Sequence, residues 1–296
     1  MKKRVLFVAS LFLATATFAQ DGLTSKKGEA YLPEAGDWAL GFDAAPFIGY
    51  FGNLANGETG NSMNAAWLDG ARASIVGKMF KDETTAYRGR VRLGFGSTSA
   101  DQLGFYDQDA DPTTNQIEYT NTAKSSNFNL VLGGGIEKRR GNTRIQGYYG
   151  GELLISLSSF NQTWDYGRDY TDNWAVNEVA PVGNIQGTAF AERVTERKAG
   201  STFAFGLRGF VGVEWFIAPK VSLGAEYGWG LGFASTGEGE ETIEYWGFVE
   251  NSTATAPSLQ SETIKTGGSS AFQLDTDNNA NSIFGGSGQI NLIFHF

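Results

Sequence analysis

The feature that most constrains this chain is an alternation of apolar and polar side chains, which is clearest over its last residues. Reading backwards from the C-terminus, every second residue is apolar or glycine, and most of those between are small or polar. Successive side chains of a β-strand point to opposite faces. Asn281–Phe296 is therefore predicted to be a strand with one apolar face, and it ends the chain on an aromatic residue.

Seven earlier segments alternate in the same way and predict seven further strands. In the clearest of them, Tyr87 and Val91 alternate with Arg88 and Arg90. Because proline cannot donate a hydrogen bond to a strand ladder, we expect a bulge or a strand end at Pro46 in the first segment. The seven segments are Asp37–Tyr50, Ala66–Phe80, Thr84–Ser97, Ser125–Lys138, Thr143–Ser158, Ser201–Phe216 and Lys220–Phe233.

Short and long connections alternate between these segments. The short ones lie at Lys81–Glu83, Arg140–Asn142 and Ile217–Pro219, and the long ones at 51–65, 98–124, 159–200 and 234–280. This asymmetry is typical of outer-membrane barrels, which have short periplasmic turns and long extracellular loops. The sequence thus predicts an all-β fold: an eight-stranded antiparallel transmembrane β-barrel in a Gram-negative outer membrane, with both termini in the periplasm.

A soluble periplasmic sandwich or lipocalin-like barrel would also have alternating strands, but its apolar faces would point inward. An eight-stranded barrel is just wide enough for side chains to fill its interior. Because a buried charge needs a partner, we expect the charged residues of the polar faces to form a network in the lumen while the apolar faces meet lipid. These residues are Asp43, Arg72, Lys78, Arg88, Arg90, Arg92, Glu137, Glu152, Arg208, Glu214 and Glu226.

The N-terminal residues predict export. Lys2, Lys3 and Arg4 precede a short apolar run, and small residues follow it, so we expect residues 1–19 to be a signal peptide cleaved before Gln20. Residues 20–36 would then form a periplasmic lead-in, and residues 37–296 would form the barrel. No segment has the run of apolar residues that a transmembrane helix needs.

Composition argues against several kinds of chemistry. The chain has no cysteine, a single histidine and a formal net charge of −9, which disfavours thiol chemistry and nucleic-acid binding. Ser287 shares a face with His295, but eight residues of extended strand separate them by about 26 Å. We therefore expect no Ser–His pair and no enzymatic activity. Glycine runs such as Gly133–Gly135 are expected to leave room for bulky side chains in the lumen.

One long loop contains a candidate calcium motif. Asp107, Asp109, Asp111 and Glu118 occupy positions 1, 3, 5 and 12 of an EF-hand loop. Position 6, however, is Pro112, which cannot adopt the left-handed conformation of the usual glycine. Two interpretations remain open for 98–124: a weak Ca²⁺ site of looser geometry, or a hydrated acidic loop.

The other long loops carry aromatic residues, and these also allow two interpretations. Aromatic side chains among polar ones suit contacts with partner proteins or glycans. They could equally belong to hairpins that extend the barrel above the membrane and pack on each other. The residues are Trp164, Tyr166, Tyr170, Trp174, Tyr245 and Trp246.

Three sequence boxes resemble outer-membrane β-barrel proteins of the Bacteroidota: LPEAGDWALGFDAAPFIGYFGN, FIAPKVSLGAEYGWGLGF and the terminal INLIFHF. The expected architecture is similar to the eight-stranded OmpA/OmpX type. The resemblance implies that the barrel-assembly machinery recognises Phe296 as an insertion signal. It also implies an outer-membrane location in contact with lipid, and says little about activity. Two function classes remain open: a non-enzymatic structural or interaction protein, for which a subunit role in a larger outer-membrane complex is compatible, and a small pore or transporter.

Overall fold

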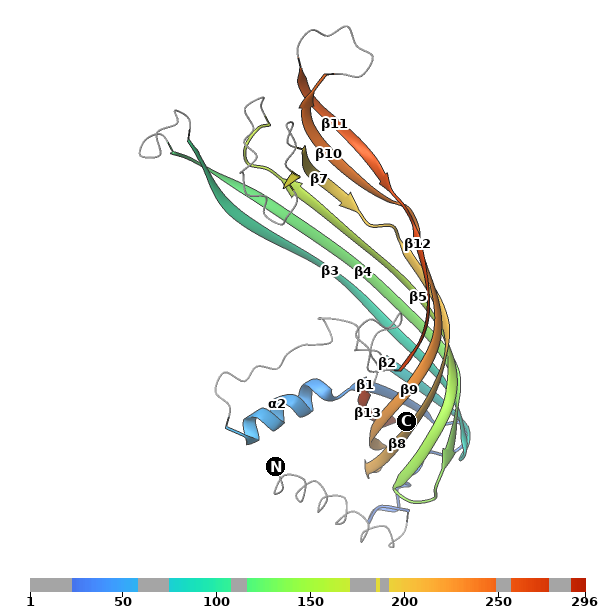
Figure 1. The fold of residues 1–296 in the computed structure, drawn as a ribbon. Coiled ribbons are helices and arrows are strands. Elements are labelled where there is room, and N and C mark those ends of the chain that lie inside the picture. Colours follow the sequence, from blue (N-terminus) through green and yellow to red (C-terminus); the bar gives the residue numbers. More distant parts are fainter. Residues whose placement is uncertain are drawn as a thin grey trace, which may run out of the picture.

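The computed structural model describes residues 23–57, 75–107, 116–170, 185–186, 192–248, 257–276 and 289–296. Almost all of their regular structure is antiparallel β-strand, joined in one 13-stranded sheet (Figure 1). The strands are β1 Trp38–Asp43, β2 Ile75–Asp82, β3 Thr85–Asp107, β4 Gln116–Arg140, β5 Ile145–Asp165, β6 Ile185–Gln186, β7 Glu192–Lys198, β8 Thr202–Ala218, β9 Val221–Thr236, β10 Gly239–Gly247, β11 Ser258–Thr266, β12 Ser269–Thr276 and β13 Gln289–His295.

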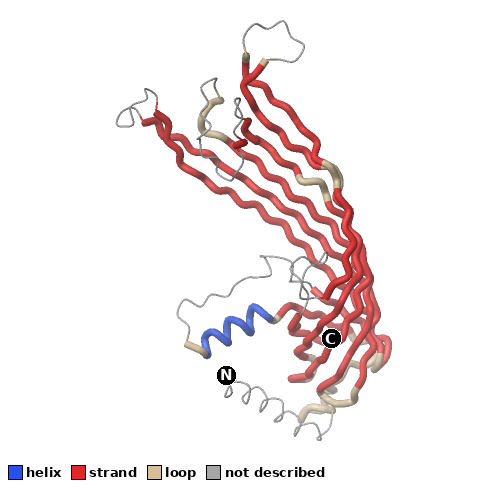
Figure 2. Tube along the Cα trace, viewed as in Figure 1, coloured by secondary structure: helices blue, strands red, loops and turns tan. Residues whose placement is uncertain are grey.

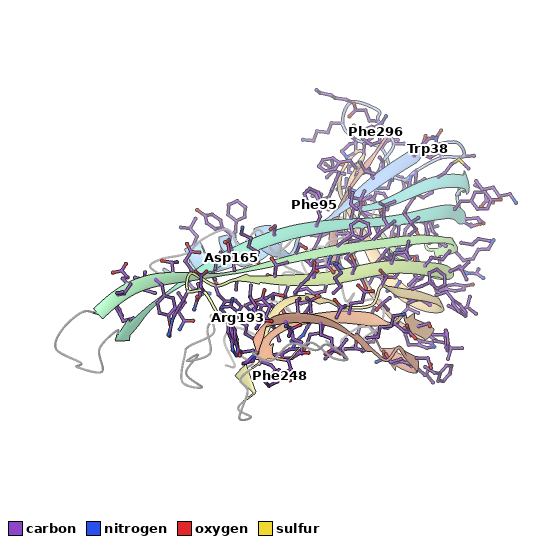
Figure 3. The ribbon with its side chains drawn as sticks, turned by 90° about the horizontal axis from the view of Figure 1, so that it is seen from above. Trp38, Phe95, Asp165, Arg193, Phe248 and Phe296 are labelled. Atoms are coloured by element: carbon purple, nitrogen blue, oxygen red, sulfur yellow. The ribbon has the colours of Figure 1, made fainter. Side chains whose placement is uncertain are left out.

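Eight of these strands close into a ring. Each hydrogen-bonds antiparallel to the next in the order β1, β2, β3, β4, β5, β8, β9, β13, and β13 returns to β1 through pairs such as Ala39↔His295. The ends of the chain complete the closure, because the backbone N–H of Phe296 donates to the carbonyl of Trp38 at 2.8 Å. Trp38 and Phe296 lie side by side there (Figure 3). The predicted all-β, antiparallel arrangement and its eight-strand closure are confirmed.

The three predicted short connections are also confirmed. Tight turns join β2 to β3, β4 to β5 and β8 to β9, all at the same end of the ring (Figure 2). Gly141 takes up a positive φ of 112° in the second turn, which glycine does at little cost. In the third turn, Lys220 follows Pro219 with a φ of 63°, and it is the one non-glycine residue with a positive φ in the described part of the chain.

The predicted long loops are partly wrong, because much of 98–124, 159–200 and 234–280 is strand. β3 and β4 remain paired out to Asp107↔Gln116, and β7, β10, β11 and β12 lie in the other two segments. The alternation fades in these segments because Ser, Thr, Asn and Gln occupy both faces. A strand whose side chains are polar on both faces has no alternation of apolar and polar residues by which its sequence could be recognised.

The first predicted strand is shorter than expected. β1 ends at Asp43, and the helix α2 (Ala45–Ala55) begins with Pro46 in its first turn. Extension of the strand to Tyr50 is therefore wrong, although the strand end before Pro46 is confirmed. Proline is tolerated in a first helical turn because its missing N–H has no partner there in any case. No helix among the described residues is long and apolar enough to cross a membrane.

Residues 66–74 of the second predicted strand and 281–288 of the last lie outside the described residues. β9 divides one of its edges between two partners. Its first half pairs with β13, as in Leu223↔Leu292, and its second half pairs with β12, as in Phe233↔Phe272. β12 lies within 234–280, which was predicted to be a single loop.

Side chains of the ring are sorted in the opposite sense to those of a soluble protein. Phe95, Leu93 and Leu207 point outward, and 82%, 62% and 61% of their surfaces are exposed. Glu137 and Glu214 point inward and are fully buried at 0%. The side chains projecting from both faces of the strands are visible in Figure 3. The apolar faces are therefore outside and the charged faces inside, as the alternation predicts.

Candidate functional site: an ion network inside the ring

Charged side chains from six ring strands meet inside the ring. Every one of them has a relative exposure of 6% or less, and each contacts at least one charge of opposite sign. We call this cluster the ring network. Its members are Lys78, Arg88, Arg90, Glu137, Arg139, Glu152, Arg208, Glu214 and Glu226.

One layer of the ring network is centred on Glu137 and Glu214. Lys78 Nζ lies 3.1 Å from the Glu137 carboxylate and 3.0 Å from Glu214 Oε2. Arg139 Nη1 donates to the same two carboxylates at 2.7 and 2.9 Å. Lys78 belongs to β2 and Glu214 to β8, which are opposite each other with three strands between them in either direction. This ion pair therefore crosses the interior of the ring.

The second layer is centred on Glu152 and Glu226. Arg88 donates to Glu226 through both terminal nitrogens, at 2.6 and 3.2 Å. Arg208 Nη1 lies 2.7 Å from Glu152 Oε1 and 2.9 Å from Glu226 Oε1, and Arg90 Nη2 lies 3.1 and 3.2 Å from the same two oxygens. Arg88 on β3 and Glu226 on β9 are again on opposite strands, and Arg88 reaches Glu137 of the first layer at 3.5 Å.

Aromatic rings and glycines complete the packing of the ring network. The Arg88 guanidinium lies 4.1 Å from the centroid of Phe210, a geometry that favours a cation–π contact. A Cβ atom at Gly150 would collide with Phe210 and with the carbonyl oxygen of Ile136. A Cβ atom at Gly228 would lie 3.0 Å from the Arg208 guanidinium. Inward-facing glycines thus leave the space that large side chains occupy, as the sequence predicted for its glycine runs.

Ser222, His295 and Glu214 contact each other beside the first layer, but their order is not that of a catalytic triad. Ser222 Oγ lies 3.0 Å from His295 Nε2 and donates to Glu214 Oε1 at 2.6 Å, and that oxygen is 3.1 Å from the same Nε2. In a triad the carboxylate holds Nδ1. Here Nδ1 is buried with no hydrogen-bond partner among the described residues, and Ser222 is fully buried. This arrangement offers no accessible nucleophile.

The end of the ring that carries the tight turns is closed by aromatic side chains. The rings of Phe80 and Phe216 lie 5.7 and 5.2 Å from the imidazole of His295. The Arg139 guanidinium lies 5.4 Å from Phe80 and 5.7 Å from Phe216. Phe80 and Phe216 are themselves almost completely buried. On their strands Phe80 and Phe216 follow Lys78 and Glu214 toward the tight turns, so this aromatic layer lies below the ions.

The N-terminal lead-in crosses that end of the ring. Gly36 N–H donates to the Phe80 carbonyl at 2.8 Å beside β1. Tyr31 lies under the Arg144 guanidinium, 3.7 Å from it, directly before β5. β1 and β5 have three strands between them in either direction, so the chain from Tyr31 to Gly36 spans the mouth. Pro33, in the middle of this span, is buried.

The remaining predicted lumen residues are Asp43, Arg72 and Arg92. Asp43 and Arg92 occupy inward positions and are half-buried. Arg72 lies outside the described residues. Arg139 was not predicted as a lumen residue because the fourth strand was expected to end at Lys138. It lies two residues after Glu137, so an extension of the same alternation would have placed it on the inward face. Ser222 was missed as a partner of His295 because the contact depends on the register of β9 against β13.

The calcium motif is only partly within the described residues. Asp109 and Asp111 lie outside them. Asp107 pairs with Gln116 and Glu118 pairs with Phe105, so both ends of the motif belong to one ladder of β3 and β4. An EF-hand joins two helices through its loop, and this hairpin does not have that form. Among the described residues, no group of three or more His, Asp or Glu side chains could hold a metal ion.

Above the ring, the sheet continues as an extension formed by the outer halves of β3, β4 and β5 together with β7, β10 and β11 (Figure 1). Trp164, Val194 and Ile243 form a small buried core there, and Tyr245 packs against it. A neighbouring group joins Tyr170 to Trp246 and Tyr166, the last of which also packs against that core. The interpretation of these aromatic residues as hairpins packed on each other is confirmed; Trp174 lies outside the described residues.

Arg193 lies at the centre of the extension. Its guanidinium is 4.6 Å from the ring of Tyr166 and 5.1 Å from that of Tyr170, and it pairs with Glu244 at 2.9 Å. Tyr166 donates its hydroxyl proton to the Val194 carbonyl at 2.7 Å. Burial raises the pKa of Tyr166 to about 12, because the phenolate is poorly solvated there. These contacts indicate an ordered outer structure.

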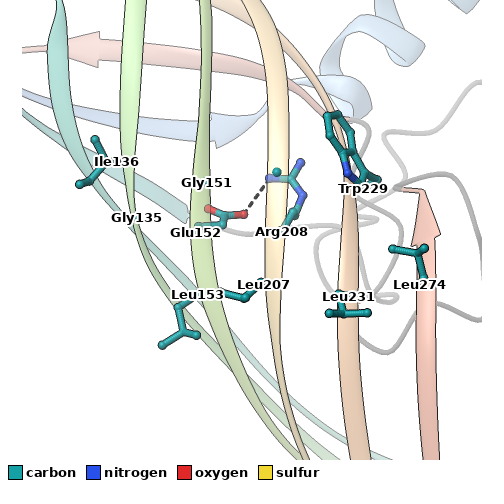
Figure 4. A pocket seen from close by; sticks show the side chains of 11 residues that line it. Gly135, Ile136, Gly151, Glu152, Leu153, Leu207, Arg208, Trp229, Leu231 and Leu274 are labelled. Atoms are coloured by element: carbon teal, nitrogen blue, oxygen red, sulfur yellow. Dashed lines mark hydrogen bonds and ion pairs between the residues drawn. The ribbon is translucent and has the colours of Figure 1, made fainter.

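A shallow groove of about 550 Å³ lies on the outer face of the ring (Figure 4). Exposed apolar side chains, among them Leu207, Trp229 and Leu274, form most of its lining. Glu152 and Arg208 also border it, but they pair with each other at 2.7 Å. The groove is part of the apolar outer surface and contains no group suited to catalysis.

No family model, curated protein or solved structure matches the chain. The resemblance of its sequence boxes to Bacteroidota outer-membrane barrels therefore has no match to support it. What holds is the coarser description, a largely antiparallel sheet in which eight hydrogen-bonded strands form a ring.

Proposed function

We propose that this chain is an outer-membrane β-barrel whose lumen is closed by the ring network, and that it acts as a non-enzymatic structural or interaction protein. The observation that carries the proposal is the distribution of side chains, with apolar residues on the outer face of the ring and charged residues inside it. Leaving Phe95 and Leu207 exposed in water while burying Glu137 and Glu214 is costly. The same arrangement is favourable when the outer face meets hydrocarbon.

The dimensions of the apolar surface support a membrane. On β3, outward apolar residues run from Tyr87 to Phe95, and the next outward positions are the polar Ser97 and Ser99. That run is about nine residues, the length with which a tilted strand crosses a bilayer. The tight turns, the start of β1 and Phe296 lie at the Tyr87 end, which we assign to the periplasm. The extension would then stand outside the cell.

Contacts across the ring favour a closed lumen over a pore. Ion pairs join opposite strands at 3.0 Å (Lys78–Glu214) and 2.6 Å (Arg88–Glu226). The aromatic layer and the lead-in close the periplasmic end below them. A conducting barrel would need an open water path through all three, so the small pore remains the alternative that experiment must separate.

Partners would be met through the extension and the lipid-facing surface. β11 is held by β10 alone among the described strands, and nearly all of its residues are exposed. Such an edge can pair with an extended segment of another chain. Lipid contacts the ring, and the barrel-assembly machinery would act on the terminal strand during insertion.

Membrane fractionation and planar-bilayer recording together test the proposal. We expect the protein in the outer-membrane fraction, with heat-modifiable migration in SDS and no conductance. Soluble recovery without detergent would contradict the membrane assignment. Stable channels with salt-proportional conductance would instead overturn the closed lumen and favour the pore. Deletion of Phe296 should lower the inserted fraction, whereas deletion of the exposed Leu23 of the lead-in should not.

A further inference from the structure

α2 is the only helix among the described residues, and its neighbours leave much of it uncovered. It follows β1 directly, and the backbone N–H of Ala44 donates to the carbonyl of Ile290 on β13 at 2.6 Å. β13 is also its main neighbour among the strands. From there the helix points away from the sheet (Figure 1). Phe51 and Leu54, in its second half, are 62% and 59% exposed.

The sequence of this helix is apolar and uncharged. No residue from Ala44 to Gly57 is acidic or basic, and Asn53 is the one amide side chain within the helix. A helix of this composition belongs either in the core of a large protein or in a membrane. The exposure of Phe51 and Leu54 shows that no protein core surrounds the second half of α2.

The register of the ring places the start of α2 at the level of the apolar outer band. Gly41 on β1 pairs with Val76 on β2, and Val76 pairs with Arg90 on β3. β1 ends two residues after Gly41, at a level that lies inside the outward apolar run of β3. Irregular backbone is unstable in hydrocarbon, whereas a helix satisfies its own backbone hydrogen bonds. A change from strand to helix at this level therefore suits lipid surroundings.

We propose that α2 is an intramembrane arm, which lies beside the ring in the hydrocarbon of the bilayer and contacts acyl chains through Phe51 and Leu54. The inference rests on the outer-membrane barrel proposed above. Leu40 and Phe42, the outward residues of β1 that precede the helix, are both exposed, so the lipid-facing surface continues from the ring onto α2. The eleven residues of the arm extend this surface by about 16 Å.

Hydrocarbon fits α2 better than the other surroundings that the fold offers. Water would leave two large apolar side chains exposed without compensation. The interior of the ring is occupied by the ring network. A second copy of the chain would have to present a matching surface to the helix, whereas acyl chains cover it without one.

A single-cysteine probe tests the inference, because the chain has no cysteine of its own. Phe51→Cys is labelled with bimane, and the full chain is reconstituted at low protein density in phosphatidylcholine vesicles with or without brominated acyl chains. Phe95→Cys, on the outward face of β3, reports on lipid, and Lys265→Cys, on the exposed β11, reports on water. Leu54→Cys replaces Phe51→Cys if the latter loses the heat-modifiable, folded form.

We expect brominated chains to lower the bimane emission at position 51 by about the same fraction as at position 95, and aqueous iodide to lower it only at position 265. Iodide quenching at position 51, with lipid quenching at position 95, would place α2 in water and overturn the inference while the barrel assignment stands. Protection of position 51 from both quenchers would mean that protein covers the helix, which also overturns it. Absence of lipid quenching at both 51 and 95 would refute the barrel assignment itself, and the inference with it.

Discussion

Glu226 provides the sharpest test of the ring network, because three arginines share its carboxylate. Oε2 accepts from Arg88 at 2.6 Å, and Oε1 lies 3.2, 3.2 and 2.9 Å from nitrogens of Arg88, Arg90 and Arg208. Glu226→Gln keeps the shape, removes the charge and directs an amide N–H₂ at a guanidinium. Breaking a buried ion pair by removing one partner costs about 3–5 kcal/mol, and we expect a loss of that size.

Chemical unfolding in detergent micelles, followed by tryptophan fluorescence, measures this loss. The exposed Glu240→Gln on β10 is the matched control and should lie within about 0.5 kcal/mol of the wild type. Adding Arg88→Met to Glu226→Gln removes both partners of the closest pair. The double variant should recover most of the loss, which gives a coupling energy of up to about 3 kcal/mol. A Glu226→Gln variant as stable as the control would refute the reasoning, since the carboxylate would then contribute nothing.

Three further predictions concern the turns, the glycines and the lead-in. Lys220→Gly should raise the free energy of unfolding by about 0.5–1 kcal/mol, because a left-handed residue with a side chain is strained; no gain in chemical unfolding would contradict this. Gly150→Ala should cost about 1–3 kcal/mol by overpacking, whereas Gly134→Ala, whose Cβ meets nothing within 4 Å, should be tolerated; equal unfolding midpoints would count against the packing argument. Tyr31→Ala removes a contact worth about 0.5–1 kcal/mol and should speed thiol labelling of a buried Ser222→Cys probe up to about fivefold, which an unchanged rate would disprove.

The ring could be predicted from the sequence because two local signals specify it. Alternation assigns each side chain to a face, and tight turns make consecutive strands antiparallel neighbours. Tyr87 and Arg88 were thus placed outside and inside correctly. The pairing of Lys78 with Glu214 could not be predicted, because it depends on strand order and register together. The same holds for His295, whose partner Ser222 lies on a neighbouring strand far away in sequence.

The regions that were predicted wrongly lack these signals. From Ser97 to Gln102 the chain is mostly polar on both faces, and apolar residues return at alternate positions only at Leu103 and Phe105. Residue type therefore gives little to distinguish an exposed hairpin from a loop, yet the β3–β4 ladder continues to Asp107↔Gln116. After Asp43 the expected strand becomes α2 at Ala45. There the alternation gives way to a nearly continuous apolar run, and a short run of that kind is compatible with either element. Residue type alone does not decide between them.

The closed interior and the glycine content of this chain have one physical cause. A ring of eight strands is only wide enough for side chains to fill, so a large inward side chain needs small neighbours on the adjoining strands. Arg208 lies beside the glycine at position 228, and Phe210 covers Gly150, its partner on β5. Because glycine backbone leaves room for these side chains, basic residues and glutamates from opposite strands come within 2.6–3.0 Å of each other. A pore would require small residues at the charged positions, whereas the glycines here lie beside those positions on neighbouring strands. The closed lumen that we propose therefore rests on the inner surface of the ring itself.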